Sequence, residues 1–120
     1  MVKVAFQGVA GAYSEEAVRQ YFGPTVESVP CHTLDELFPL VENGEASFAM
    51  LPVENAVAGS VTGAYELLLE RDLRINAEVI LHVHHMLMAA PGTKREAIKR
   101  VRSHPQALAQ CQQYLSRHDL

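Results

Sequence analysis

The sequence has little of what marks extracellular, membrane or nucleic-acid-binding proteins. It contains only two cysteines, Cys31 and Cys111, which are too few for a disulfide scaffold and are typical of a reducing, cytoplasmic location. Its apolar stretches are short and are interrupted by His, Arg or Glu, so no transmembrane helix is predicted. Its formal net charge of -4 argues against nucleic-acid binding through a basic surface. The 120 residues, 48% of them hydrophobic, are expected to form one globular domain or a piece of one.

Motifs for phosphate binding and nucleophilic catalysis are also missing. Gly8 and Gly11 fit neither the dinucleotide-binding pattern nor the P-loop, and no nucleophile elbow or catalytic triad can be drawn. Zinc requires three or four ligands, and no Cys/His pair at matching spacing completes a site with His82, His84 and His85. We therefore predict no cofactor and no metal, and we interpret these histidines as partly buried or edge residues of a strand.

Hydrophobic patterning predicts an α/β chain in its first part. Residues 2–6, 26–31 and 46–51 have the composition of short buried strands, and a segment with helical spacing follows each of them. Strands that alternate with helices imply a parallel sheet with right-handed crossover connections.

Short polar patterns mark where the helices are expected to begin. Ser14 is a good N-cap for the first helix, which a Gly-Pro step at residues 23–24 ends. Residues 33–36, 93–96 and 103–106 each fit the Ser/Thr-x-x-Glu/Gln capping box. We therefore expect helices to start at these four places.

The last third of the sequence has a different pattern. Residues 73–90 form a long β-rich run that exceeds the usual length of a strand, so it is expected to leave one lobe and enter another. We assign residues 1–78 to a first α/β lobe and residues 79–120 to the start of a second one. The last helix has an apolar stripe of Leu108, Cys111 and Leu115, and residues 101–103 read as a very short strand.

The second lobe needs at least one more strand to cover its apolar faces, so it is expected to be incomplete in this chain. An exposed apolar edge favours association, and a homodimer or higher homo-oligomer is the expected state.

Polar residues gather at three predicted strand-to-helix junctions, around Ser14, at residues 54–60 and at residues 103–110. Such junctions lie on one edge of a parallel sheet, so the first two are expected to face the third across a cleft between lobes. Helix starts with hydroxyl and amide donors suit a ligand that carries a carboxylate. Ordinary capping and turn formation explain the same residues and stay open as an alternative.

The junction at residues 54–60 is the central candidate for a functional site in the sequence. It follows a predicted buried strand and precedes a segment, residues 61–70, that reads as a helix. It places a carboxylate, a carboxamide, a glycine and a hydroxyl together: Glu54, Asn55, Gly59 and Ser60. We interpret this loop as one wall of a site for a small anionic molecule.

Three segments of the sequence resemble the signatures of one enzyme family, the prephenate dehydratases. They are Phe6-Gln-Gly-Val-Ala-Gly-Ala-Tyr-Ser14, Leu51-Pro-Val-Glu-Asn-Ala-Val-Ala-Gly-Ser60 and Ser103-His-Pro-Gln-Ala-Leu-Ala-Gln-Cys111. They occur in the order that the family has, and the resemblance covers the whole chain. It implies a two-lobed α/β fold like that of type II periplasmic binding proteins, with the active site in the cleft.

The resemblance also implies an activity that needs neither cofactor nor metal. The family converts prephenate to phenylpyruvate, with loss of water and carbon dioxide, in the biosynthesis of phenylalanine. By resemblance, Asn55, Ser103 and Gln110 bind and orient the substrate. Glu54 is the one catalytic candidate, and a structural role is the alternative for Glu54 and Cys111.

Two departures from the family pattern matter. Ala56 stands where relatives often have Ser or Thr, and the family's Thr-Arg-Phe segment is absent from the chain. We therefore expect the 120 residues alone to have little or no dehydratase activity. Arogenate dehydratase, a non-catalytic carboxylate-binding module and a domain completed by a second chain are the alternative readings.

Overall fold

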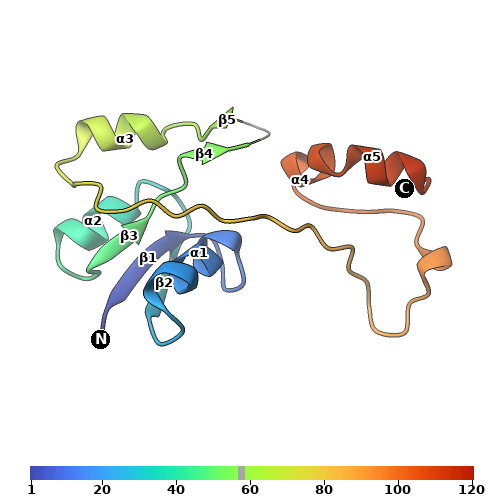
Figure 1. Cartoon of the computed structure of the whole chain (residues 1–120), viewed down its shortest axis with the longest axis horizontal. Coiled ribbons are helices and arrows are strands. Elements are labelled where there is room, and N and C mark those ends of the chain that lie inside the picture. Colours follow the sequence, from blue (N-terminus) through green and yellow to red (C-terminus); the bar gives the residue numbers. More distant parts are fainter. Residues whose placement is uncertain (57–58) are drawn as a thin grey trace. The chain divides into compact units, whose positions relative to one another are not determined.

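Strands and helices alternate over residues 3–50 of the molecule, and a small hairpin and a helix follow (Figure 1). The structure is a computed structural model that describes residues 1–56 and 59–120. The chain divides into two compact units, which we call unit 1 (Met1–His82) and unit 2 (Val83–Leu120).

Three parallel strands form the centre of unit 1. β1 (Lys3–Gln7) lies between β2 (Glu27–Cys31) and β3 (Phe48–Met50), and it pairs in parallel with both (Figure 1). The predicted parallel α/β arrangement is therefore confirmed for this part of the chain. Short apolar strands separated by helices give this result because a parallel pair needs a crossover connection.

Alternate residues of β1 supply two separate apolar clusters. Successive side chains of a strand point to opposite faces of the sheet. Val4 and Phe6 pack with Val18 of α1 (Tyr13–Phe22), together with Val26. The second cluster draws on Ala5, on α2 (Leu37–Glu42) and on the flanking strands, and consists of Ala5, Cys31, Leu37, Phe38 and Ala46. The core of unit 1 therefore lies on both faces of a three-stranded sheet.

The first two helices begin differently from the prediction. α1 starts at Tyr13 after Ala12, and Ser14 lies inside its first turn and does not act as the cap. α2 starts at Leu37, and its Glu36 carboxylate accepts a hydrogen bond from the His32 N–H at 3.0 Å. In both segments a glutamate side chain accepts an N–H of the chain before the helix, and the hydroxyl caps expected from the short motifs do not form.

The segment after β3 forms a small antiparallel hairpin, where we had predicted a loop leading directly into a helix. β4 (Glu54–Asn55) pairs with β5 (Gly59–Ser60), and α3 (Ala64–Glu70) begins only after Gly63. Val57 and Ala58, which belong to the predicted loop, lie outside the described residues. The prediction that the helix starts at residue 61 was wrong, because the hairpin uses the residues that precede Val61.

Residues 73–90 do not form the predicted long strand. The chain there is extended without a strand assignment, and His82, His84 and His85 are exposed. A β-rich sequence becomes a strand only where a neighbouring strand takes up its N–H and C=O groups. The interpretation of these histidines as strand residues was therefore wrong.

Unit 2 contains short helices joined by extended segments. Pro91 and Gly92 turn the chain, and a single 3₁₀ turn follows at Arg95–Ala97. The predicted last helix is divided at Cys111 into α4 (Pro105–Gln110) and α5 (Gln112–Arg117). No strand forms at residues 101–103, which the structure describes.

Two further predictions for the last helix need correction. The His104 Nδ1 atom accepts the Gln106 N–H at 3.1 Å, so His104 and not Ser103 caps α4. Leu108, Cys111 and Leu115 are partly exposed, so the apolar stripe is not buried. No helix in the described part of the chain is long and apolar enough to cross a membrane.

Candidate functional site

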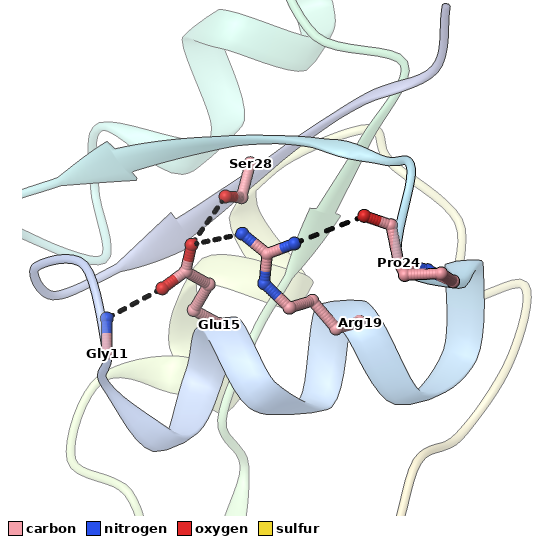
Figure 2. Close-up of polar contacts among 5 residues, drawn as sticks. All are labelled: Gly11, Glu15, Arg19, Pro24 and Ser28. Atoms are coloured by element: carbon pink, nitrogen blue, oxygen red, sulfur yellow. Dashed lines mark hydrogen bonds and ion pairs between the residues drawn. The ribbon is translucent and has the colours of Figure 1, made fainter.

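The glycine-containing loop between β1 and α1 is fastened by a single carboxylate. Glu15 of α1 accepts the Gly11 N–H at 2.7 Å through Oε2, and it accepts the Ser28 hydroxyl of β2 at 2.8 Å through Oε1 (Figure 2). Arg19 donates to the same Oε1 at 3.0 Å and also to the Pro24 carbonyl. Glu15 thus joins the loop, the helix and the neighbouring strand.

Hydrogen bonds keep Glu15 charged although it is nearly enclosed. The backbone N–H of Gly11, then the Ser28 hydroxyl and the Arg19 guanidinium, hold the pKa of Glu15 below its ordinary value. Donors of this kind favour the ionised form of a carboxyl group. No motif in the sequence singled out Glu15, because two of its partners lie on other elements. Ser14, the site candidate of this segment, is half-buried beside it.

The hairpin that carries Asn55 is also fastened by a carboxylate. Glu54 Oε1 accepts the Ser60 hydroxyl at 3.2 Å and the Tyr65 hydroxyl of α3 at 2.7 Å. Donation to Glu54 raises the pKa of Tyr65 above its ordinary value. These contacts favour a structural role for Glu54 over the catalytic one, since its carboxylate ties β4 to β5 and to α3. Tyr65 carried no signal in the sequence.

Asn55 itself is half-buried and pairs with Gly59 across the hairpin. The three polar candidates of this segment, Asn55, Gly59 and Ser60, therefore lie on one small ribbon, although not at a helix start. We had expected the positive end of a helix dipole at this loop to bind a ligand carboxylate. The structure does not support this argument, because α3 begins four residues after Ser60.

The other polar candidates lie in unit 2 and line one cavity of about 1020 Å³. Ser103, Gln110 and Cys111 are among its lining residues, and so is His85. The His85 Nε2 atom lies 2.6 Å from Oε1 of Gln110. The structure thus brings Ser103 and Gln110 to the same cavity.

Basic side chains surround this cavity. Lys99, Arg100, Arg102 and Arg117 line it, and none of its lining residues, all of them described, is Asp or Glu. A cavity lined by one sign of charge concentrates ligands of the opposite sign. Among the described residues, no group of three or more His, Cys, Asp or Glu side chains is placed to hold a metal ion. The cavity is therefore suited to an organic anion.

Comparison with known proteins decides the family. The family model described as prephenate dehydratase matches residues 4–120. The chain belongs to the prephenate dehydratase family. The resemblance drawn from the three sequence segments is confirmed.

Several curated relatives of this family member are plant proteins. Arogenate dehydratase 1 of Petunia hybrida is 50% identical over 111 residues, which are 92% of this chain and 26% of the relative. Arogenate dehydratase/prephenate dehydratase 2 of Arabidopsis thaliana, a chloroplastic protein, is 47% identical over 116 residues, 97% of this chain and 30% of the relative. The chain therefore spans less than a third of the length of these relatives.

Two solved structures resemble the chain. GqqA, described as a novel type of quorum quenching acylase, has a TM-score of 0.86 and 37% identity over 98% of this chain and 43% of its own. The prephenate dehydratase of Streptococcus mutans has a TM-score of 0.55 and 27% identity over 59% of this chain and 37% of its own.

The expected cytoplasmic location is contradicted by these relatives. Several of them, including arogenate dehydratases 3, 4 and 5 of Arabidopsis thaliana, are named as chloroplastic. The expectation rested on the low cysteine content, which argues against a disulfide-dependent secreted domain but does not distinguish one reducing compartment from another.

Proposed function

We propose that this chain forms the prephenate-binding part of a prephenate dehydratase, which converts prephenate to phenylpyruvate in phenylalanine biosynthesis. The observation that carries the proposal is the cavity of unit 2. There Ser103 and Gln110, which come from a family signature, lie among basic side chains and no carboxylate. Prephenate carries two carboxylates and a ring hydroxyl, so it offers the charge and the acceptors that this cavity would bind.

The reaction requires orientation and a proton. The bond from the ring to its carboxylate breaks, and the electron pair moves through the diene and expels the ring hydroxyl, so that carbon dioxide is released and the ring becomes aromatic. One proton is delivered to the departing oxygen, which leaves as water. A positioned donor typically accelerates such a step by about 10²–10⁴-fold. Removing water from around the ring carboxylate favours its departure.

Within this proposal, the polar candidates bind and orient the substrate. Asn55 and the hairpin residues Gly59 and Ser60 act from unit 1, together with Ser14, and Ser103 and Gln110 act from unit 2. The arrangement follows the two-lobed architecture of type II periplasmic binding proteins, with residues 1–78 and 79–120 in different lobes. The proposal includes self-association as a homodimer or higher homo-oligomer.

Arogenate dehydratase is the second candidate, and the names of the relatives favour it. The curated relatives cited above are named as arogenate dehydratases, some of them with both activities. Arogenate differs from prephenate in carrying an amino group in place of the keto oxygen. The basic lining of the cavity serves the carboxylates of both molecules equally, so the substrates have to be compared directly.

Binding and turnover of the two substrates test the proposal. Dissociation constants for prephenate and arogenate are measured by calorimetry with this chain, and turnover is measured with the chain and with the complete protein that carries it. Benzoate, an aromatic monocarboxylate, is the control ligand. Acylase activity is assayed alongside, because GqqA is described as an acylase.

We expect saturable binding of prephenate or arogenate that is much tighter than binding of benzoate. Gln110→Ala should weaken it, whereas Gln112→Ala is the matched control because Gln112 is exposed on the next helix and does not line the cavity. The ratio of the two turnover rates assigns the substrate. Absence of binding and turnover for both substrates, or acylase activity in their place, would overturn the proposal.

A further inference from the structure

A short contact links two segments of unit 2 that are 25 residues apart. The Nε2 atom of His85 and the side-chain oxygen Oε1 of Gln110 are separated by 2.6 Å, and both residues line the cavity. A carboxamide oxygen accepts hydrogen bonds and cannot donate them, so this contact is a hydrogen bond in the tautomer of His85 that carries its proton on Nε2. In that tautomer His85 is the donor and the Gln110 carbonyl is the acceptor.

We propose that His85 is the positioning residue that sets the carboxamide of Gln110 in the orientation needed to bind a substrate carboxylate. The inference rests on the proposed function and deepens it, because it says how one site residue is prepared for its ligand. It also gives a role to one of the three histidines for which the sequence analysis considered a metal site and predicted none.

The chemical reason lies in the two ends of a carboxamide. Its oxygen accepts hydrogen bonds and its NH₂ group donates them, and the terminal torsion of glutamine is broad and nearly two-fold. The side chain of Gln110 alone therefore does not choose which end meets an anion. With the oxygen bound to Nε2–H of His85, the NH₂ end is directed away from the histidine and is the end that an anion accepts.

The charge of the cavity lining makes the orientation of the Gln110 carboxamide important for binding. The cavity presents lysine and arginine side chains and no carboxylate, so its ligand is anionic. A carboxamide oxygen turned toward that ligand would face it with an unfavourable dipole. His85 thus contributes to affinity through Gln110 and need not touch the ligand.

The neighbouring histidines do not share this geometry. His104 is occupied with a backbone contact, since its Nδ1 accepts the Gln106 N–H at the start of α4. His84 is adjacent to His85 in sequence but is not among the residues that line the cavity. His84 therefore provides a matched control for the loss of an imidazole from the same segment.

Four variants test the positioning role in the complete protein that carries this chain. His85→Leu removes the donor, His85→Gln places an amide N–H near the Nε2 position, and His84→Leu is the control. Gln110→Ala, alone and combined with His85→Leu, completes a double-mutant cycle. Circular dichroism and the urea midpoint establish that each variant is folded.

We expect His85→Leu to raise the KM for the preferred substrate about 10-fold with kcat within about 2-fold, which is the pattern of lost ground-state binding. His85→Gln should restore most of the affinity, and His84→Leu should match the unaltered protein. His85→Leu combined with Gln110→Ala should be no worse than Gln110→Ala alone, because the first change acts through Gln110.

Three results would overturn the inference: an unchanged KM in His85→Leu, additive losses in the double variant, or an equal loss in His84→Leu. A failure of the proposed function is recognised separately, as absence of binding of both substrates to the unaltered protein. In that case the side-chain amide resonances of Gln110, observed by NMR without ligand, test whether His85 orients the Gln110 carboxamide. His85→Leu must shift them and His85→Gln must return them toward their original place, and unmoved resonances reject the contact.

Discussion

Unit 1 and unit 2 both contain many apolar residues but fold in different ways. The buried apolar side chains of the described chain all lie in unit 1, and most of them belong to the two clusters on the faces of its parallel sheet. None of residues 83–120, all of which the structure describes, is buried. The difference shows that apolar residues build a core only when strand pairing gathers them on a common surface.

The two units also differ in charge. Unit 1 has four Lys or Arg and twelve Asp or Glu residues, a formal charge of -8, and unit 2 has six and two, a formal charge of +4, which together give the -4 of the chain. The small net charge of the whole sequence therefore conceals a basic segment. An anionic ligand is attracted to unit 2 and repelled by unit 1. The buried core therefore lies in unit 1, whereas the positive charge that would attract an anionic ligand lies in unit 2.

The largest expected effect is on the core of unit 1. Phe6→Ala removes a ring that is 1% exposed, and such a change typically lowers the free energy of unfolding by about 3–5 kcal/mol. Leu108→Ala in unit 2 removes a partly exposed side chain and should cost about 1 kcal/mol or less. Urea unfolding followed by circular dichroism measures both.

If Phe6→Ala leaves no folded protein, Phe6→Leu provides the milder change in the same site. Equal losses from Phe6 and Leu108 substitutions would break the comparison, because unit 2 would then carry as much of the core as unit 1.

A smaller effect is expected from Glu15, which fastens the loop of unit 1. Its folded pKa is below the ordinary value of 4.5, so the unfolded chain binds more protons in acid. The stability from Glu15 is therefore present above about pH 4.5 and is lost as the pH falls through the folded pKa. Glu15→Gln should lower the urea midpoint at neutral pH and leave a smaller difference in acid.

Glu16→Gln, on the exposed side of the same helical turn, is the control for removing a carboxylate from α1. The anchoring role assigned to Glu15 would be rejected by midpoints that fall equally in both variants, or by a Glu15→Gln deficit that persists unchanged in acid.

The smallest effect compares one thiol from each unit. Cys31 is 5% exposed, and burial, with a contribution from the Glu36 carboxylate, raises the pKa of its thiol. Cys111 is partly exposed beside the cavity of unit 2. A thiol reagent at neutral pH should modify Cys111 about 10-fold faster than Cys31 or more, because the thiolate is the reactive form and needs access.

Mass spectrometry of the modified peptides measures the two rates, and unfolding in urea should make them similar. Equal rates in the folded protein would show that Cys31 is as accessible as Cys111, and the contrast in burial between the units would not hold.

The local sequence pattern predicted the strands of the parallel sheet correctly, but it did not predict the helix starts or the hairpin. The three parallel strands were predicted because each is a short apolar segment whose composition alone marks it. The starts of α1, α2 and α4 were not predicted correctly, because the Ser or Thr expected to cap each of them does not do so: no side chain caps α1 or α2, and His104 caps α4. The hairpin of Glu54–Asn55 and Gly59–Ser60 was missed because its pairing replaces a helix start that the local composition also allows.

The sequence by itself determined the family, through three ordered signatures, and the alternation of strands and helices in unit 1. Only the tertiary structure decided which side chains meet: Glu15 with Ser28, Glu54 with Tyr65, and His85 with Gln110. The physical reason is one of range. Strand and helix preferences act among residues that are neighbours in the chain, whereas a hydrogen bond between distant residues exists only after folding has placed its donor and its acceptor within about 3 Å of each other.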